Sequence, residues 1–270
     1  AEYGRVSLPA FYMRRALRIL PPLIFYVVVV VALTYAGVFP EQTKQTIWAL
    51  TFTCNLGNCG GWIGIHTWSL SVEEQFYLVI PVLFIAASRS VIAAIAAMMP
   101  IAVLVFYFLK LPTVAAIASM FLTIGYAVAY ALYEEQLMPI VKRMPPAVWF
   151  VAGIGVLALM EWTGSRPATI ANVCLRSPLL VFITMWTVAR DSVIAEILRS
   201  SPLRSIGLVS YSLYLWQQAA TFPMPWPAML IALCGAFAFA YLSYWTIEIQ
   251  LITFGRRLTA LLRQRSALMA

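Results

Sequence analysis

Three ionisable side chains stand close together in the stretch HTWSLSVEEQFYLVIP, residues 66–81. His66 is the chain's only histidine, and the adjacent carboxylates Glu73 and Glu74 enter a segment that stays apolar through Ala87. Ionisable groups in such a membrane segment are unfavourable, so a functional role is the first explanation to test. An imidazole or a carboxylate can take the proton of a reacting hydroxyl. The stretch therefore predicts acid–base chemistry, with Glu73 and His66 as candidate catalytic residues.

Structural roles for the same residues compete with that prediction. Ser71 precedes Glu74 by three residues, which fits a capping box, so we predict that Glu74 satisfies amides at a helix start. Glu73 has no such role and shares a helical face with Tyr77, which makes it the better functional candidate. A single histidine at a membrane interface is more often a hydrogen-bonded structural residue than a catalyst. Both interpretations of His66 stay open.

A second group of candidates precedes the first apolar run. Arg14, Arg15 and Arg18 form a basic cluster, and guanidinium groups pair well with the phosphates of a nucleotide-like donor. The alternative is that they anchor the membrane topology and contact anionic lipid. Sequence alone favours the alternative.

Polar residues also interrupt the apolar runs near the end of the chain. The stretch SYSLYLWQQ at 210–218 is unusually polar for a span, so we expect it to face a cavity or another helix. Glu248 closes an apolar run, where we expect it to pair with Arg256 or Arg257. With one histidine and no cysteines paired near it, the sequence predicts no metal site.

The amino-acid composition indicates which class of fold positions these residues. The chain of 270 residues is 63% hydrophobic and 10% charged, with a mean hydropathy of +0.87. Apolar runs recur at about the ~20 residues that a helix needs to cross a bilayer. The 18 basic residues are scattered between these runs, which argues against nucleic-acid binding. We therefore predict an all-α, polytopic helical membrane protein.

The apolar runs predict about eight transmembrane helices with both termini in the cytoplasm. In this layout the cytoplasmic segments hold every basic residue except Lys44, Lys110, Arg166 and Arg176, as the positive-inside rule demands. The predicted spans are 19–39, 69–87, 90–109, 113–133, 147–161, 175–189, 207–222 and 226–248.

The segments between the spans carry further expectations. Residues 7–18 are expected to form an amphipathic helix, with a break or restart at Pro21-Pro22. Residues 134–146 are expected to form a charged loop. Cys54 and Cys59 form a disulfide or remain free thiols, and neither alternative is favoured. We expect one membrane domain over 1–270 that lacks an N-terminal piece, with a basic cytoplasmic tail at 249–270.

Several of these stretches together resemble the integral-membrane acyltransferases of the acyltransferase-three type. The matching segments are FYMRRALRILP at 11–21, HTWSLSVEEQFYLVIP at 66–81, SYSLYLW at 210–216 and YWTIE at 244–248. The resemblance implies about ten spans of ~20 residues in a bacterial inner membrane. It also implies a cytosolic acyl-CoA donor, such as acetyl-CoA, and a carbohydrate or glycolipid acceptor in lipopolysaccharide, exopolysaccharide or another glycoconjugate. No metal is implied.

The resemblance also implies roles for individual residues. Glu73 would be the carboxylate of the central cavity, and Arg14-Arg15 would lie near the entrance for coenzyme A. The polar residues expected to line or support that cavity are Trp68, Ser69, Glu74, Tyr77, Tyr211, Tyr214 and Glu248.

The sequence departs from the family pattern at three places. Gln217 stands where members often have histidine, and the closing motif reads Ile-Glu-Ile-Gln instead of Ile-Glu-x-Pro. Members also carry two earlier spans, and the first of these contains an arginine, ten residues and then the catalytic histidine. We therefore expect an O-acyltransferase whose N-terminal part precedes Ala1. The alternative is a non-catalytic transporter or scaffold that retains the fold.

Overall fold

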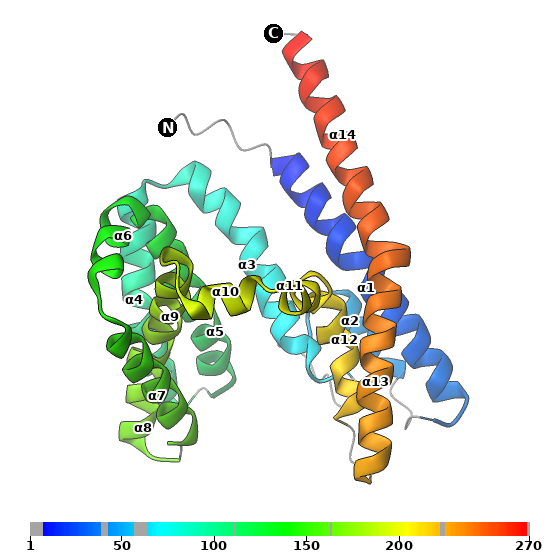
Figure 1. Ribbon diagram of the computed structural model, residues 1–270, viewed down its shortest axis with the longest axis horizontal. Coiled ribbons are helices and arrows are strands. Elements are labelled where there is room, and N and C mark those ends of the chain that lie inside the picture. Colours follow the sequence, from blue (N-terminus) through cyan, green and yellow to red (C-terminus); the bar gives the residue numbers. More distant parts are fainter. Residues whose placement is uncertain are drawn as a thin grey trace. The chain divides into compact units, whose positions relative to one another are not determined.

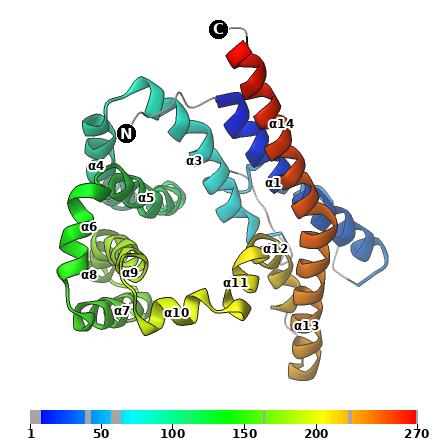
Figure 2. The same ribbon diagram turned by 45° about the horizontal axis from the view of Figure 1, so that its top comes forward.

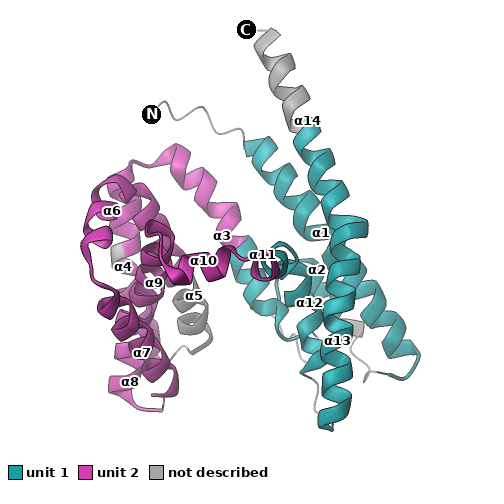
Figure 3. Ribbon diagram, in the orientation of Figure 1, with its two compact units in different colours: residues 1–74, 204–270 teal, residues 75–203 magenta. Residues whose placement is uncertain are grey.

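All regular elements in the described part of the chain are helices, which confirms the all-α prediction (Figure 1). The computed structural model describes residues 8–38, 43–56, 64–110, 112–162, 164–221 and 225–268. The chain divides into two compact units, one formed by residues 1–74 with 204–270 and the other by residues 75–203 (Figure 3).

The first unit joins both ends of the chain around one apolar core. Helix α14 packs along α1, and α12 packs against both α1 and α13 (Figure 2). Buried Leu23, Tyr26, Leu70, Leu215 and Trp216 form the centre of this core. Its helices are α1 (Leu8–Tyr35), α2 (Thr43–Leu50), the start of α3 (Thr67–Ala86), most of α11 (Ser201–Leu208), α12 (Ser210–Ala220), α13 (Trp226–Ser243), the π-helix η2 (Tyr244–Glu248) and α14 (Ile249–Leu268).

Helix α1 runs through the proline pair where we predicted a break. Pro21 and Pro22 lie inside the helix, and Pro22 is fully buried. Each proline removes one helical hydrogen bond. The Tyr211 hydroxyl donates to the nearby Ile19 carbonyl at 2.9 Å, which connects α12 to this part of α1. The predicted break was wrong because core packing outweighs the two lost bonds.

The second unit is a set of helices packed around α5 and α9. Helix α5 packs against α4 and α9, and α7 packs against α9. The Thr123 hydroxyl lies 2.7 Å from that of Ser177, which links α5 to the start of α9. The helices are α4 (Arg89–Phe108), α5 (Pro112–Leu132), α6 (Glu134–Arg143), α7 (Pro146–Glu161), α8 (Arg166–Ala171), the π-helix η1 (Asn172–Arg176), α9 (Ser177–Ala189) and α10 (Val193–Arg199).

The expected charged loop at 134–146 is mostly helix α6. Glu134 and Glu135 lie in its first turn and Lys142 and Arg143 in its last, so both ends match the helix dipole. A bend of 103° separates α6 from α7. In Figure 2, which looks nearly along α5 and α9, α6 runs crosswise to them. The loop prediction was wrong because charges at the two ends of a short helix resemble the composition of a loop.

The described helices support a multi-pass membrane protein. Five are long and apolar enough to cross a bilayer, or six if α6 and α7 form one broken span. Of the remaining predicted spans, 113–133 falls on α5 with 21 residues and 147–161 on α7 with 16. The span at 207–222 is divided at Val209, which leaves α12 with 11 residues. The count of eight spans and the cytoplasmic termini stay predictions.

Candidate functional site

The start of α3 determines how the two adjacent carboxylates are used. The helix begins at Thr67, so Ser71 and Glu74 lie in its second turn and not at its first. The fully buried Ser71 hydroxyl donates to the Thr67 carbonyl at 3.0 Å and accepts from the Cys54 amide at 3.2 Å. The predicted capping box was therefore wrong, and both glutamates are available for other contacts.

Arg15 of α1 binds both carboxylates, but not equally. Its Nε lies 3.0 and 3.1 Å from the two Glu74 oxygens, and its Nη2 lies 2.7 Å from Glu74 Oε1. The same Nη2 reaches Glu73 Oε1 at 3.3 Å. The Glu74 side chain is 13% exposed and the Glu73 side chain is 46% exposed. Arg15 thus binds Glu74 through a two-pronged contact and leaves nearly half of the Glu73 side chain exposed.

His66 lies directly before α3, among aromatic side chains. Its ring centroid lies 5.8 Å from that of Tyr26 and 5.1 Å from that of Tyr214. The Tyr214 hydroxyl donates to the His66 carbonyl at 2.5 Å and lies 2.8 Å from the Ser69 hydroxyl. These bonds connect α12 to the start of α3 and fix the backbone of His66.

Tyr211, Ser212 and Tyr214 of α12 contact other segments as predicted, whereas Gln217 is exposed. Ser212 donates to Glu248, and both side chains are almost completely buried. No ion pair joins Glu248 to Arg256 or Arg257 in the described part of the chain. The expected pairing was wrong because η2 places Glu248 toward α12. Arg18 lies close enough to interact electrostatically with Glu248.

Tyr211 connects the two acidic positions of this unit. Its hydroxyl binds the Ile19 carbonyl, and the side chain lies close enough to Glu74 and Glu248 to interact electrostatically with both. The first unit therefore brings most of the predicted site residues together on α1, α3, α12 and η2.

Three predicted site residues have other surroundings. Half-buried Trp68 packs against Ala49 and Cys54. Tyr77 shares a face of α3 with Glu73, but it belongs to the second unit, where its ring meets that of Phe76 edge-on at 6.1 Å. Among the described residues, no ion pair involves Arg14, although it directly precedes Arg15.

The cysteine prediction is answered only in part. Cys54 is disulfide-bonded, whereas Cys174 and Cys234 are free thiols. Cys59 lies outside the described residues. The Thr67 hydroxyl lies 3.0 Å from Cys54 Sγ, so the loop before α3 is attached to the start of that helix.

Tyr26 and Ser212 belong to this site although the sequence did not single them out. A tyrosine inside the aliphatic run of α1 was the available signal for Tyr26, because a buried phenol in a membrane helix usually meets polar or aromatic partners. Ser212 lies within SYSLYLW, but its pairing with Glu248 joins residues 36 positions apart, so no local pattern indicates it.

The arrangement can position the Glu73 carboxylate for proton transfer, and it holds the His66 imidazole among aromatic rings. The Arg15 fork orients the glutamates, and tyrosine hydroxyls fix the neighbouring backbone. Guanidinium groups of Arg14 and Arg18 are available for anionic ligands. Within the described ranges, no three His, Cys, Asp or Glu side chains gather as a metal site would require.

Comparisons with known proteins agree with the resemblance in the sequence. A family model described as an acyltransferase domain matches residues 2–248. The peptidoglycan O-acetyltransferase OatA of Listeria monocytogenes serovar 1/2a (strain ATCC BAA-679 / EGD-e) is 24% identical over 289 residues, which cover 90% of this chain and 46% of that protein. The chain thus spans less than half the length of this relative. No solved structure matches the chain significantly.

Proposed function

Because the chain belongs to the acyltransferase-three family, we propose that it transfers an acetyl or similar acyl group to a hydroxyl of a cell-wall carbohydrate. The similarity to a peptidoglycan O-acetyltransferase supports this class of acceptor. We further propose acyl-CoA as the donor and a bacterial plasma membrane as the location.

The observation that supports this function most directly is that Arg15 binds Glu74 more extensively than Glu73. Glu74 takes the two-pronged contact, and Glu73 keeps a single bond at 3.3 Å with nearly half of its side chain exposed. A carboxylate held in this way has a fixed direction and still has oxygens that can accept a bond from an incoming hydroxyl. Glu73 is therefore the proposed carboxylate at the reacting centre.

The reaction needs one proton acceptor and one leaving group. The carbohydrate oxygen forms a bond to the thioester carbonyl carbon, the hydroxyl proton passes to a base, and the carbon–sulfur bond breaks. The CoA sulfur leaves and takes up a proton. In the family pattern the base is a histidine of an earlier span, so we give His66 a supporting part in holding or passing the proton. Arg14 and Arg18 are proposed to meet the donor phosphates.

The direct test uses the complete protein, of which this chain is the proposed transferase domain. The protein is reconstituted in vesicles with isotope-labelled acetyl-CoA and soluble cell-wall glycan fragments, and labelled ester is measured. We expect Glu73→Gln to reduce transfer about 100-fold or more and His66→Ala about tenfold. The matched control Glu196→Gln changes an exposed carboxylate on α10 and should leave the rate unchanged.

A second measurement separates the enzyme from a non-catalytic transporter or scaffold. Deletion of the full gene should remove acyl esters from surface glycans, as measured by mass spectrometry. Unchanged glycans, or equal transfer by wild type and Glu73→Gln, would contradict the proposed function. Complete loss of transfer in His66→Ala would contradict the supporting part given to His66.

A further inference from the structure

The second unit contains an apolar pocket that the proposed reaction does not use. The pocket has a volume of about 570 Å³ and is formed by α5, α6 and α9. Its size lies within the range of ~300–1,000 Å³ that is usual for small-molecule sites. Its walls are almost entirely apolar and aromatic, with Tyr126, Tyr130 and Tyr133 on one side and Val181, Phe182 and Met185 on the other.

Helix α6 covers one end of this pocket in the manner of an interfacial helix. Its lining residues Leu137 and Val141 are spaced one turn apart, and Tyr133 precedes them by another turn. The charged residues at its two ends are exposed. A helix with one apolar face and one charged face, turned 103° from the following apolar helix, fits a position along the membrane surface.

Cationic groups gather at the end of α6 where it meets α9. Lys142 and Arg143 directly follow Val141 of the pocket wall. The Arg190 guanidinium donates to the Met144 carbonyl at 2.6 Å and lies 5.1 Å from the Trp186 ring centroid, so it holds the two helix ends together. The neighbouring acid, Asp191, is already paired with Arg199 at 3.0 Å. The last turn of α6 therefore carries positive charge, whereas Glu134 and Glu135 lie in its first turn.

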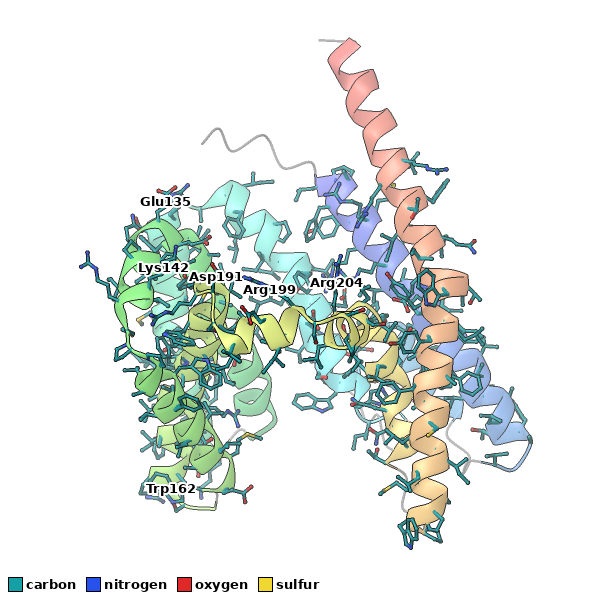
Figure 4. All side chains as sticks on the ribbon, viewed as in Figure 1. Glu135, Lys142, Trp162, Asp191, Arg199 and Arg204 are labelled. Carbon is teal, nitrogen blue, oxygen red and sulfur yellow. The ribbon has the colours of Figure 1, made fainter. Side chains whose placement is uncertain are left out.

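Basic and acidic side chains both lie at one end of the second unit. In Figure 4, Glu135, Lys142 and Asp191 lie toward one end of its helices and Trp162 lies at the other. The pocket extends from Tyr126 of α5 to Tyr133, which directly follows that helix, over seven residues or about 10 Å. One leaflet of the hydrocarbon core is about 15 Å deep. The pocket is thus long enough for much of one acyl chain.

We propose that this pocket binds one acyl chain of an anionic phospholipid, with the headgroup phosphate against Lys142 and Arg143. The apolar pocket can hold the acyl chain of the lipid. The exposed cations that follow Val141 favour a negatively charged headgroup. This lipid site lies in the second unit and does not depend on the acyl-transfer proposal.

Lipid retention by the full-length protein tests this site. The protein is purified from nanodiscs that contain equal amounts of phosphatidylglycerol and phosphatidylcholine, and bound lipid is measured by native mass spectrometry. We expect the wild type to retain one phosphatidylglycerol per chain, preferred about tenfold or more over phosphatidylcholine. Ala129→Trp fills the pocket and should reduce retention at least tenfold. Ile154→Trp introduces the same side chain at an exposed position of α7 and should change nothing.

A charge variant separates the headgroup from the tail. Lys142→Gln with Arg143→Gln should retain lipid but lose the preference for phosphatidylglycerol. The control Arg166→Gln, which removes an exposed cation at the start of α8, should keep that preference. If Ala129→Trp lowers the melting temperature strongly, Val181→Phe provides a milder filling of the same pocket. If the filled variants retain as much lipid as Ile154→Trp does, the retained lipid comes only from the surrounding bilayer. That result would overturn the proposed site. Equal retention of the two phospholipids by the wild type would overturn the headgroup contact.

Discussion

The adjacent residues Glu73 and Glu74 differ in how many hydrogen bonds each accepts from Arg15. The Arg15 guanidinium lies side-on to Glu74 and meets Glu73 only through Nη2. Two-pronged contacts between arginine and a carboxylate are stronger and more directional than single ones. Glu74 is therefore the structural partner, and Glu73 remains available for chemistry.

Removal of the Arg15 guanidinium should destabilise the first unit. Arg15→Gln leaves two carboxylates next to each other, with Glu74 mostly buried. We expect a loss of about 1–3 kcal/mol in unfolding free energy, below the value for a fully buried pair because Glu73 is half exposed. Arg15→Lys should recover only part of it, because an ammonium cannot form the two-pronged contact. Thermal unfolding of the full-length protein in detergent measures both variants.

Two controls make this measurement specific. Arg14→Gln removes the neighbouring charge, which has no ion pair among the described residues, and should change stability by less than about 0.5 kcal/mol. Combining Arg15→Gln with Glu74→Gln should cost less than the sum of the two single changes. Additive effects would show that Arg15 and Glu74 do not act as a pair.

At the scale of helices, the sequence predicted apolar segments better than their ends and connections. The apolar runs at 90–109 and 113–133 correspond closely to α4 and α5, because about 20 apolar residues have few alternatives to a helix in lipid. The Pro21-Pro22 pair and the charges of α6 were misinterpreted. Both are local signals, and in this protein tertiary packing and the helix dipole outweigh them.

Close packing of α4 against α5 depends on a small residue. A Cβ at Gly125 would lie 2.8 Å from Met99 Sδ and 3.9 Å from Ala96 Cβ. Small residues allow membrane helices to approach in this way. Gly125→Leu should therefore force the helices apart and lower the unfolding free energy by about 1–3 kcal/mol, as measured by thermal unfolding.

A matched glycine on α7 shows whether the effect comes from packing. A Cβ at Gly153 meets nothing within 4 Å. Gly153→Leu should be neutral or slightly stabilising, since leucine favours a helix more than glycine does. Equal effects of the two leucines would contradict the role of Gly125 in the contact between α4 and α5.

At the scale of the whole molecule, the candidate site depends on contacts between distant parts of the sequence. Arg15 meets Glu73 across 58 positions and Tyr214 meets His66 across 148. Periodicity and composition describe one segment at a time, so they indicated the candidates but not their partners. The resemblance placed Arg15 and Glu73 in one family pattern, yet the ion pair between them became visible only in the structure.

The membrane topology of the second unit can be tested at the two ends of α7. This helix has 16 residues, about 24 Å, so it nearly spans the ~30 Å hydrocarbon core. The positive-inside rule predicts that Lys142 lies in the cytoplasm, and Trp162 follows the far end of α7 (Figure 4).

In a protein whose Cys174 and Cys234 are replaced by serine, we introduce Lys142→Cys or Trp162→Cys and label with a membrane-impermeant maleimide. Intact spheroplasts should label only Trp162→Cys, and permeabilised cells should label both.

The result decides between two structures for α6 and α7. The bend of 103° between them fits either a surface helix followed by a span or a re-entrant loop that returns to the same side. Labelling of both cysteines from one side would establish the re-entrant loop and remove 147–161 from the predicted spans. Labelling from opposite sides would place α6 at the cytoplasmic surface, where Lys142 and Arg143 can meet anionic headgroups.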